Sequence, residues 1–186
     1  MKKNLKKMTR FVFVGFILLT ILLMFKDENL KCDVDLLVLD ETKMPIGWKN
    51  KWGILPPALD TLGAEQAYGM SMEKNEEGAG HTVYKYRNKW LAIFYLRFNK
   101  EIYFPSMGWN WSELKEAKNL PLQADQIQIK CGDSNYKYLD DGCSAVLRYG
   151  SYISDFGLSR KDDKIPTEEF IDIVLKIDEQ FRQCKQ

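Results

Sequence analysis

The side chain with the clearest potential for acid–base chemistry is His81, the single histidine of the chain. Its ordinary pKa lies near neutrality, which makes it the natural candidate for a general base. A general base also needs a nucleophile or an acid partner, and nothing in the sequence identifies one. We therefore interpret His81 as a surface or strand-cap histidine, with catalysis as the alternative.

Two acid pairs and one glycine-rich stretch are the other candidates for chemistry. Asp140-Asp141 and Asp162-Asp163 lie on predicted turns, and calcium would need more oxygen ligands at close spacing. Gly78-Ala79-Gly80 lacks the further glycine and the following helix that a phosphate-binding loop requires. The sequence therefore predicts a non-catalytic protein without a cofactor, and the alternative is an exported hydrolase that uses His81 or the acid pairs.

An aromatic cluster is the feature that most suggests binding. Tyr103, Trp109 and Trp111 crowd a stretch that contains proline and glycine, and we predict a loop over residues 105–112. Exposed aromatic faces stack against sugar rings, peptides or the apolar patch of a partner protein. These three residues are the predicted ligand-binding residues. Packing of the same rings onto the core is the competing interpretation.

Four cysteines suggest disulfides rather than a metal site. Cys131 ends one predicted strand and Cys143 begins the next, so an antiparallel return would bring them close enough to bond. Cys184 lies on the apolar stripe of a predicted helix, where a buried thiol and a bond to Cys32 are both possible. A zinc site is disfavoured because the cysteine spacing contains no close ligand pair and the chain has one histidine.

The element that places these residues outside the cytoplasm is an apolar run at residues 11–25, preceded by a basic flank at residues 1–10. At ~1.5 Å per residue the run covers roughly 22 Å, and snorkelling of Arg10 extends it toward the ~30 Å hydrocarbon core. Charged and bulky residues follow from Lys26, where signal-peptide cleavage requires small ones. We predict a retained transmembrane anchor. The alternatives are a cleaved signal peptide and a lipoprotein signal acylated at Cys32.

Charge predicts the topology of the chain and the partners of its exported part. The basic flank orients the N-terminus to the cytoplasm, so that a linker (26–42) and one domain (43–186) are extracytoplasmic on the cell membrane. Six of the 27 basic residues and none of the 26 acidic residues precede residue 27, which leaves the exported part with a net charge of −5. This charge disfavours nucleic acid and anionic lipid as its partners. The expected partners are the bilayer, through residues 11–25, and a protein, peptide or glycan.

Hydrophobic periodicity predicts an α+β fold, in which helices cover an antiparallel sheet. Alternation predicts strands over 67–72 and 81–86, joined by a polar turn at 73–80. Apolar residues at steps of four, four and three then predict a helix over 89–102, with Asn88 as its N-cap. The sequence therefore predicts a hairpin followed by a helix.

The clearest element is a C-terminal helix with Thr167 as its N-cap and acidic residues in its first turn. Its apolar stripe predicts that it covers a sheet. The stripe consists of Phe170, Ile173, Val174, Ile177, Phe181 and Cys184.

The two halves of the chain also share short similarities that suggest a β-β-α duplication. Ala64-Glu65-Gln66 resembles Ala124-Asp125-Gln126, and residues 83–86 resemble residues 146–149. Coincidence is the competing explanation. The sequence as a whole predicts a membrane-anchored extracytoplasmic binding or sensing module of unknown ligand.

Overall fold

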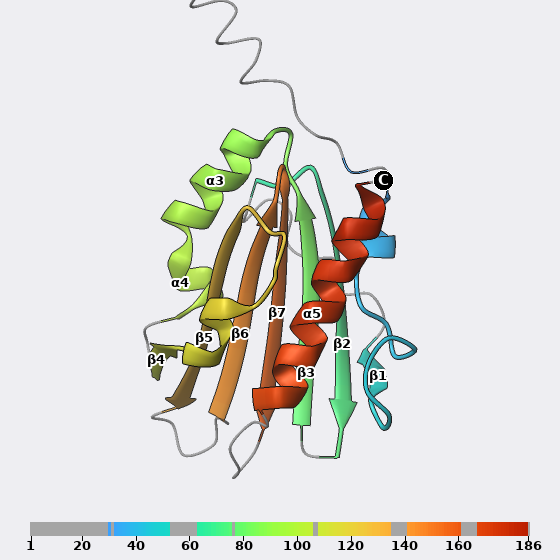
Figure 1. Cartoon of the computed structure of the whole chain (residues 1–186), viewed down its shortest axis with the longest axis vertical. Helices are drawn as coiled ribbons and strands as arrows, with labels where there is room; N and C mark the ends of the chain where they lie inside the picture. Colours follow the sequence, from blue (N-terminus) through green and yellow to red (C-terminus); the bar gives the residue numbers. More distant parts are fainter. Residues whose placement is uncertain are drawn as a thin grey trace, which may run out of the picture.

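One antiparallel sheet with helices on both faces forms the framework of the protein (Figure 1). The computed structural model describes residues 30, 32–52, 63–75, 77–105, 108–134, 141–160 and 167–185. In chain order the elements are η1 (Val34–Leu37), β1 (Lys49–Trp52), β2 (Gln66–Lys74), β3 (Glu77–Lys85), α3 (Lys89–Phe98), α4 (Lys100–Tyr103), β4 (Trp109–Glu113), η2 (Lys115–Asn119), β5 (Gln126–Ser134), β6 (Asp141–Tyr149), β7 (Tyr152–Arg160) and α5 (Thr167–Cys184).

The predicted transmembrane run at residues 11–25 lies outside the described residues, as does its orientation. Among the helices that the structure does describe, none has the length and apolar character needed to span a bilayer.

The sheet joins the two halves of the chain at its centre. Its seven strands follow the order β1-β2-β3-β7-β6-β5-β4, and all pairs are antiparallel. The predicted hairpin corresponds to β2 and β3, while β5, β6 and β7 form a meander in the second half. Pairing of β3 with β7 closes the sheet between these two units. The predicted α+β class, with an antiparallel sheet and helical cover, is confirmed.

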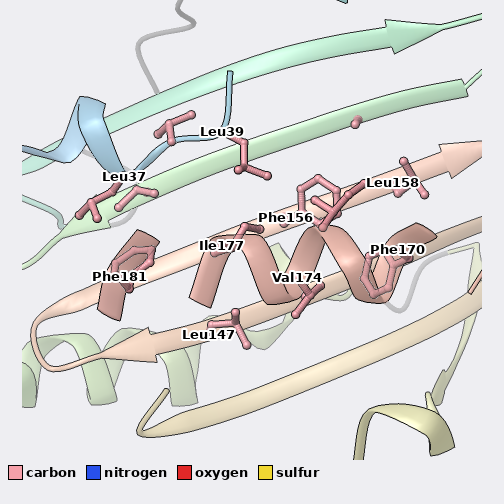
Figure 2. Close-up of a cluster of buried hydrophobic side chains, with 14 of the residues drawn as sticks. Leu37, Leu39, Leu147, Phe156, Leu158, Phe170, Val174, Ile177 and Phe181 are labelled. Carbon is pink, nitrogen blue, oxygen red and sulfur yellow. The ribbon is translucent and has the colours of Figure 1, made fainter. Parts of the chain in front are cut away.

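Helix α5 packs on one face of the sheet and buries the whole stripe that the sequence predicts. Figure 2 labels four of the stripe residues, Phe170, Val174, Ile177 and Phe181, among the buried side chains of the sheet. The rings of Phe170 and Phe156 of β7 stack with their centroids 5.6 Å apart, and Phe181 stacks on Tyr149 of β6 at 4.0 Å. Each fully buried phenylalanine contributes about 2 kcal/mol or more through apolar burial. We call this side of the sheet the α5 face.

The N-terminal segment completes the layer beside α5. Leu37 and Leu39 are fully buried next to the helix (Figure 2), and Leu37 is the last residue of η1. Cys32 is bonded to Cys184 in the last turn of α5, with a Cα–Cα distance of 5.4 Å. Of the two possibilities that the sequence allowed for Cys184, the structure contains the disulfide.

His81 lies inside this core, so its interpretation as a surface or strand-cap residue is wrong. The side chain is 0% exposed. Its Nδ1 accepts a hydrogen bond of 2.8 Å from the Leu39 N–H, and its Nε2 lies 2.9 Å from the Ser154 hydroxyl oxygen. Because Nδ1 accepts, the ring proton is on Nε2 and is donated to Ser154. Burial lowers the pKa of His81 to about 3, which keeps the ring neutral.

Neutral burial of His81 predicts a pH-dependent stability. The unfolded histidine titrates near 6.5 and the folded one near 3, so below pH 6.5 the unfolded state binds a proton that the folded state lacks. The contribution of this group is complete above pH 6.5 and decreases by about 1.4 kcal/mol per pH unit as pH falls toward 3. In urea titrations at a series of pH values below 6.5, we expect the free energy of unfolding of the wild type to fall by about 1.4 kcal/mol per pH unit relative to that of His81→Gln. A difference independent of pH would contradict this assignment.

Helix α3 packs on the opposite face, which we call the α3 face. Its N-cap is confirmed, because the Leu91 N–H donates to the Asn88 Oδ1 at 3.0 Å. Ala92 and Leu96 are buried in a second apolar cluster, together with side chains of β3, β6 and β7. The single helix predicted over 89–102 is interrupted at Asn99, where α3 ends and α4 begins.

Two predicted loops are shorter than expected. Strands β2 and β3 continue to Lys74 and from Glu77, so the turn predicted over 73–80 contracts around Asn75, whose φ is 55°. Edge strand β4 occupies Trp109–Glu113 and overlaps the second half of the loop predicted over 105–112. Glycine and charged residues suggested a turn in the first place, and proline and glycine suggested a loop in the second. Pairing with the neighbouring strands continues through both segments.

The structure does not support a duplication. Val83 of β3 packs on the α5 face, whereas its proposed counterpart Val146 of β6 belongs to the cluster on the α3 face. A repeat would place equivalent side chains on equivalent faces, since a shift of one residue moves a side chain to the other side of a strand. The sequence similarity is therefore coincidental.

Candidate functional site

A floor of small side chains lies on the part of the α3 face that α3 and α4 leave open. Across the three central strands, Gly80 pairs with Gly157 and Gly157 pairs with Ser144. In the adjacent row, Ser159 pairs with Gly78 on one side and with Gly142 on the other. The six residues that we call the groove floor are Gly78, Gly80, Gly142, Ser144, Gly157 and Ser159.

The space above this floor is open. A Cβ atom added to Gly80 or Gly157 would meet no heavy atom within 4 Å. The resulting hollow, which we call the groove, has a volume of about 580 Å³. Lys51 of β1 and Ser71 of β2 line one side of it. This volume falls within the range of small-molecule sites in proteins.

Two tryptophans from the edge strand β4 form the opposite wall. The rings of Trp109 and Trp111 are stacked, with centroids 4.8 Å apart and planes 12° from parallel. The Trp111 Nε1–H donates to the Pro105 carbonyl oxygen at 2.9 Å, and the edge of the Phe104 ring packs against the same indole. Trp111 is thus held by the two residues that follow α4. Trp109 stacks on it as the outer ring.

Trp109 can reach over the sheet because position 142 is glycine. A Cβ atom at Gly142 would lie 2.8 Å from two carbon atoms of the Trp109 ring, closer than any real contact. The missing side chain lets the indole lie against the backbone of β6. The glycine is therefore part of the wall as well as of the floor.

A polar cluster around Asp155 lies in the groove. Asp155 is half-buried and pairs with Thr82 of the neighbouring strand. Burial raises the pKa of its carboxyl to about 7, against a hydrogen bond from the Ser144 hydroxyl that favours the charged form. Burial and then the nearby Asp155 carboxyl raise the pKa of the Tyr84 hydroxyl. Near neutral pH the Asp155 carboxyl exists in both forms, so it can donate or accept a hydrogen bond.

All three predicted ligand-binding residues line the groove. Tyr103 is 4% exposed and belongs to the second apolar cluster, while Trp109 and Trp111 are half-buried. The sequence offered packing on the core and exposure to a ligand as competing interpretations of these rings. In the structure, each tryptophan is partly packed and partly exposed.

Sequence reasoning missed the floor and its carboxyl. The signal was present as small or polar residues at every second position of three segments, as in Gly78-x-Gly80, Gly142-x-Ser144 and Asp155-x-Gly157. A period of two places such residues on one face of a strand. Only the pairing of β3, β7 and β6 side by side turns three separate patterns into one surface.

The Cys131–Cys143 disulfide lies on the α5 face, behind the floor strand β6. The structure joins these cysteines, which pair across β5 and β6 with a Cα–Cα distance of 4.0 Å. The bond fixes β5, which carries the edge strand β4, to the floor strand β6. It therefore helps to hold the tryptophan wall in position.

Carboxylates and potential metal ligands are sparse among the described residues around the groove. Asp155 is the only carboxylate among the described residues that line the groove, whereas hydrolysis of a glycosidic bond commonly uses two. His81 faces the α5 core, and Asp141 begins β6 while Asp140 and the pair Asp162-Asp163 lie outside the description. Within the residues that are described, no three potential metal ligands come together.

Comparisons with known proteins leave the family open. The chain matches no protein-family model, and no curated protein matches it. Among solved structures, it is similar to the extracellular domain of PknH from Mycobacterium tuberculosis, with 9% sequence identity and a TM-score of 0.49. The likeness covers 71% of this chain and 72% of that one. At these values it assigns no family and no ligand.

Proposed function

We propose that this protein is an extracytoplasmic binding module that holds a sugar ring in the groove. The observation that carries the proposal is the stacked pair Trp109 and Trp111, which adjoins an open glycine floor and the carboxyl of Asp155. An aromatic face beside hydrogen-bonding groups suits a ligand with an apolar ring face and polar edges.

Each part of the groove has a function in this proposal. The bare backbone at Gly80 and Gly157 lets a ring approach the sheet closely. Asp155, which is both acid and carboxylate near neutral pH, can donate to or accept from a sugar hydroxyl. Ser144 and Thr82 add hydroxyl groups beside it. Peptides also bind aromatic walls, but a short floor of glycine and serine offers no pockets for their side chains.

The cellular location is part of the same proposal. Two disulfides are typical of proteins that fold in oxidising compartments. The apolar run at residues 11–25 would keep the module on the cell membrane, with the N-terminus in the cytoplasm. Such a module would sense or retain a glycan of the cell envelope or of its surroundings.

Filling the floor tests the proposal without disturbing the core. Gly157→Val adds a β-favouring side chain to open space, so we expect the free energy of unfolding to stay within about 1 kcal/mol of the wild type. Binding to an oligosaccharide array, measured with the detergent-purified full chain, should be lost because the valine occupies the place of the sugar ring.

The matched control is Ser112→Val, an exposed position of β4 whose side chain points away from the groove. This variant should bind as the wild type does. Oligosaccharide binding that survives in Gly157→Val would contradict the groove as the site. If the wild type bound extended peptides and no sugars, the proposed ligand class would be wrong, but the groove would remain the binding site.

A further inference from the structure

An aromatic stripe lies on the outer side of α3, away from the sheet. Its members are four residues apart, which places them on the helix side opposite the buried Ala92 and Leu96. Such a row of large apolar side chains on one exposed helix calls for a binding partner. The α3 stripe consists of Trp90 (43% exposed), Phe94 (50%) and Phe98 (68%), and continues into α4 with Ile102 (45%).

Basic residues accompany this stripe. Arg87, Lys89, Arg97 and Lys100 lie along it, and Glu101 is the single acid of the sequence between residues 87 and 102. Arg87, Arg97 and Lys100 are exposed, and the Lys89 ammonium lies 5.7 Å from the centroid of the Trp90 ring. The exported part is negative on average, but this side of it is locally positive.

The stripe begins at the end of the sheet where the chain enters the domain. Cys32 is bonded to the last turn of α5, whose Phe181 packs on Tyr149 and Tyr152 at the turn between β6 and β7. The last residue of β3, Lys85, pairs with Tyr152, and α3 follows from that point. Figure 1 shows the start of α3 and the C-terminal end of α5 at the same end of the sheet.

The tether between this end and the predicted anchor is short. Only four residues separate the apolar run at 11–25 from Leu30, which belongs to the core. A fully extended chain would place Leu30 within about 17 Å of the end of the run. With the anchor in the bilayer, the α3 stripe is therefore within reach of the membrane surface.

We propose that the α3 stripe docks on the anionic surface of the bilayer that holds the predicted anchor. Aromatic residues prefer the level of the lipid headgroups, and each lysine or arginine near an anionic surface adds to the attraction. A second copy of the chain fits less well, because a two-fold contact through the stripe would bring Arg97 and Lys100 toward their own copies. The net charge of the exported part disfavours anionic lipid as a partner, but this charge is an average over the whole surface. The α3 stripe is a local exception to it.

The experiment places a fluorophore on the stripe of the full chain. Phe98→Cys carries an NBD group, and Ile46→Cys, at an apolar position 98% exposed, carries it in the control. Ile46 precedes Trp48, whose Nε1–H donates a hydrogen bond to Glu169 of α5. The control label therefore lies on the α5 side of the sheet, whereas the label at position 98 lies on the α3 side. Both variants have the same tether to the anchor. Each is reconstituted into vesicles of phosphatidylcholine, with or without phosphatidylglycerol, that contain a doxyl-labelled quencher lipid.

We expect a blue-shifted NBD emission and several-fold stronger quenching at position 98 than at position 46, in vesicles with phosphatidylglycerol. In the double variant Arg97→Gln and Lys100→Gln, the docking constant should fall about fivefold per removed charge. Equal, water-like emission at both positions would overturn the proposal. Cross-linking between two copies of the unlabelled Phe98→Cys variant, together with an absence of lipid quenching in the labelled one, would also overturn it, because that result indicates self-association. A marked loss of folding stability in Phe98→Cys would also overturn it, because the ring would then pack within the chain.

Discussion

Replacing both Cys32 and Cys184 by serine is expected to lower the free energy of unfolding by about 5 kcal/mol. The two cysteines are 152 residues apart, and the bond removes the corresponding loop entropy from the unfolded chain. A loss of this size is comparable to the whole stability of many single domains, which is roughly 5–15 kcal/mol. Guanidinium unfolding of the detergent-purified full chain, followed by circular dichroism, measures it.

The second disulfide provides the control. The double replacement Cys131→Ser and Cys143→Ser opens a bond between cysteines only 12 residues apart, and the same relation predicts a loss of about 3 kcal/mol. The order of the two losses is the critical result. A larger loss from the short loop would mean that the effect of each bond lies in native packing rather than in the entropy of the unfolded chain.

The two tryptophans of the groove are expected to respond differently to replacement by alanine. Trp111 is held by the Pro105 carbonyl and by Phe104, so Trp111→Ala should cost about 2 kcal/mol of stability, roughly half the cost for a fully buried tryptophan. Trp109 is the outer ring, and Trp109→Ala should cost about 1 kcal/mol. Its larger effect should be on the ligand, with oligosaccharide affinity reduced about 30-fold, as for a binding hot spot.

Gly142→Ala separates ring position from ring identity. Both tryptophans remain, but the added methyl group would lie 2.8 Å from the Trp109 ring and must displace it. We expect loss of oligosaccharide binding together with a changed tryptophan fluorescence. Unchanged affinity in Gly142→Ala or in Trp109→Ala would argue against the tryptophan wall as the ligand contact.

The regular part of the fold could be predicted because its patterns are local. The stripe of α5 and the Asn88 cap of α3 each follow from residues within a few turns of one another. The pairing of Cys131 with Cys143 was equally accessible, since a hairpin brings neighbours in sequence together. Errors arose at the ends of strands, where glycine, proline and charged residues resemble turns.

The remainder depends on contacts between distant parts of the chain. His81 looks like a surface residue until the Leu39 backbone and Ser154 supply its two hydrogen-bond partners inside the core. The groove requires β7 to lie between β3 and β6, an order that no single strand encodes. The aromatic residues were correctly singled out by composition, but Asp155 gained its importance only from the neighbours that bury it.

The bond between Cys32 and Cys184 also has a consequence for proteolysis. It converts residues 32–184 into a covalent ring, which begins close to the predicted membrane anchor. A single cut by a protease anywhere in that ring opens the chain but releases no fragment, because both pieces remain joined through the sulfur atoms. With the anchor in place, shedding of this domain from the cell surface would require a cut in the short segment before Cys32, or a cut within the ring together with reduction of the bond.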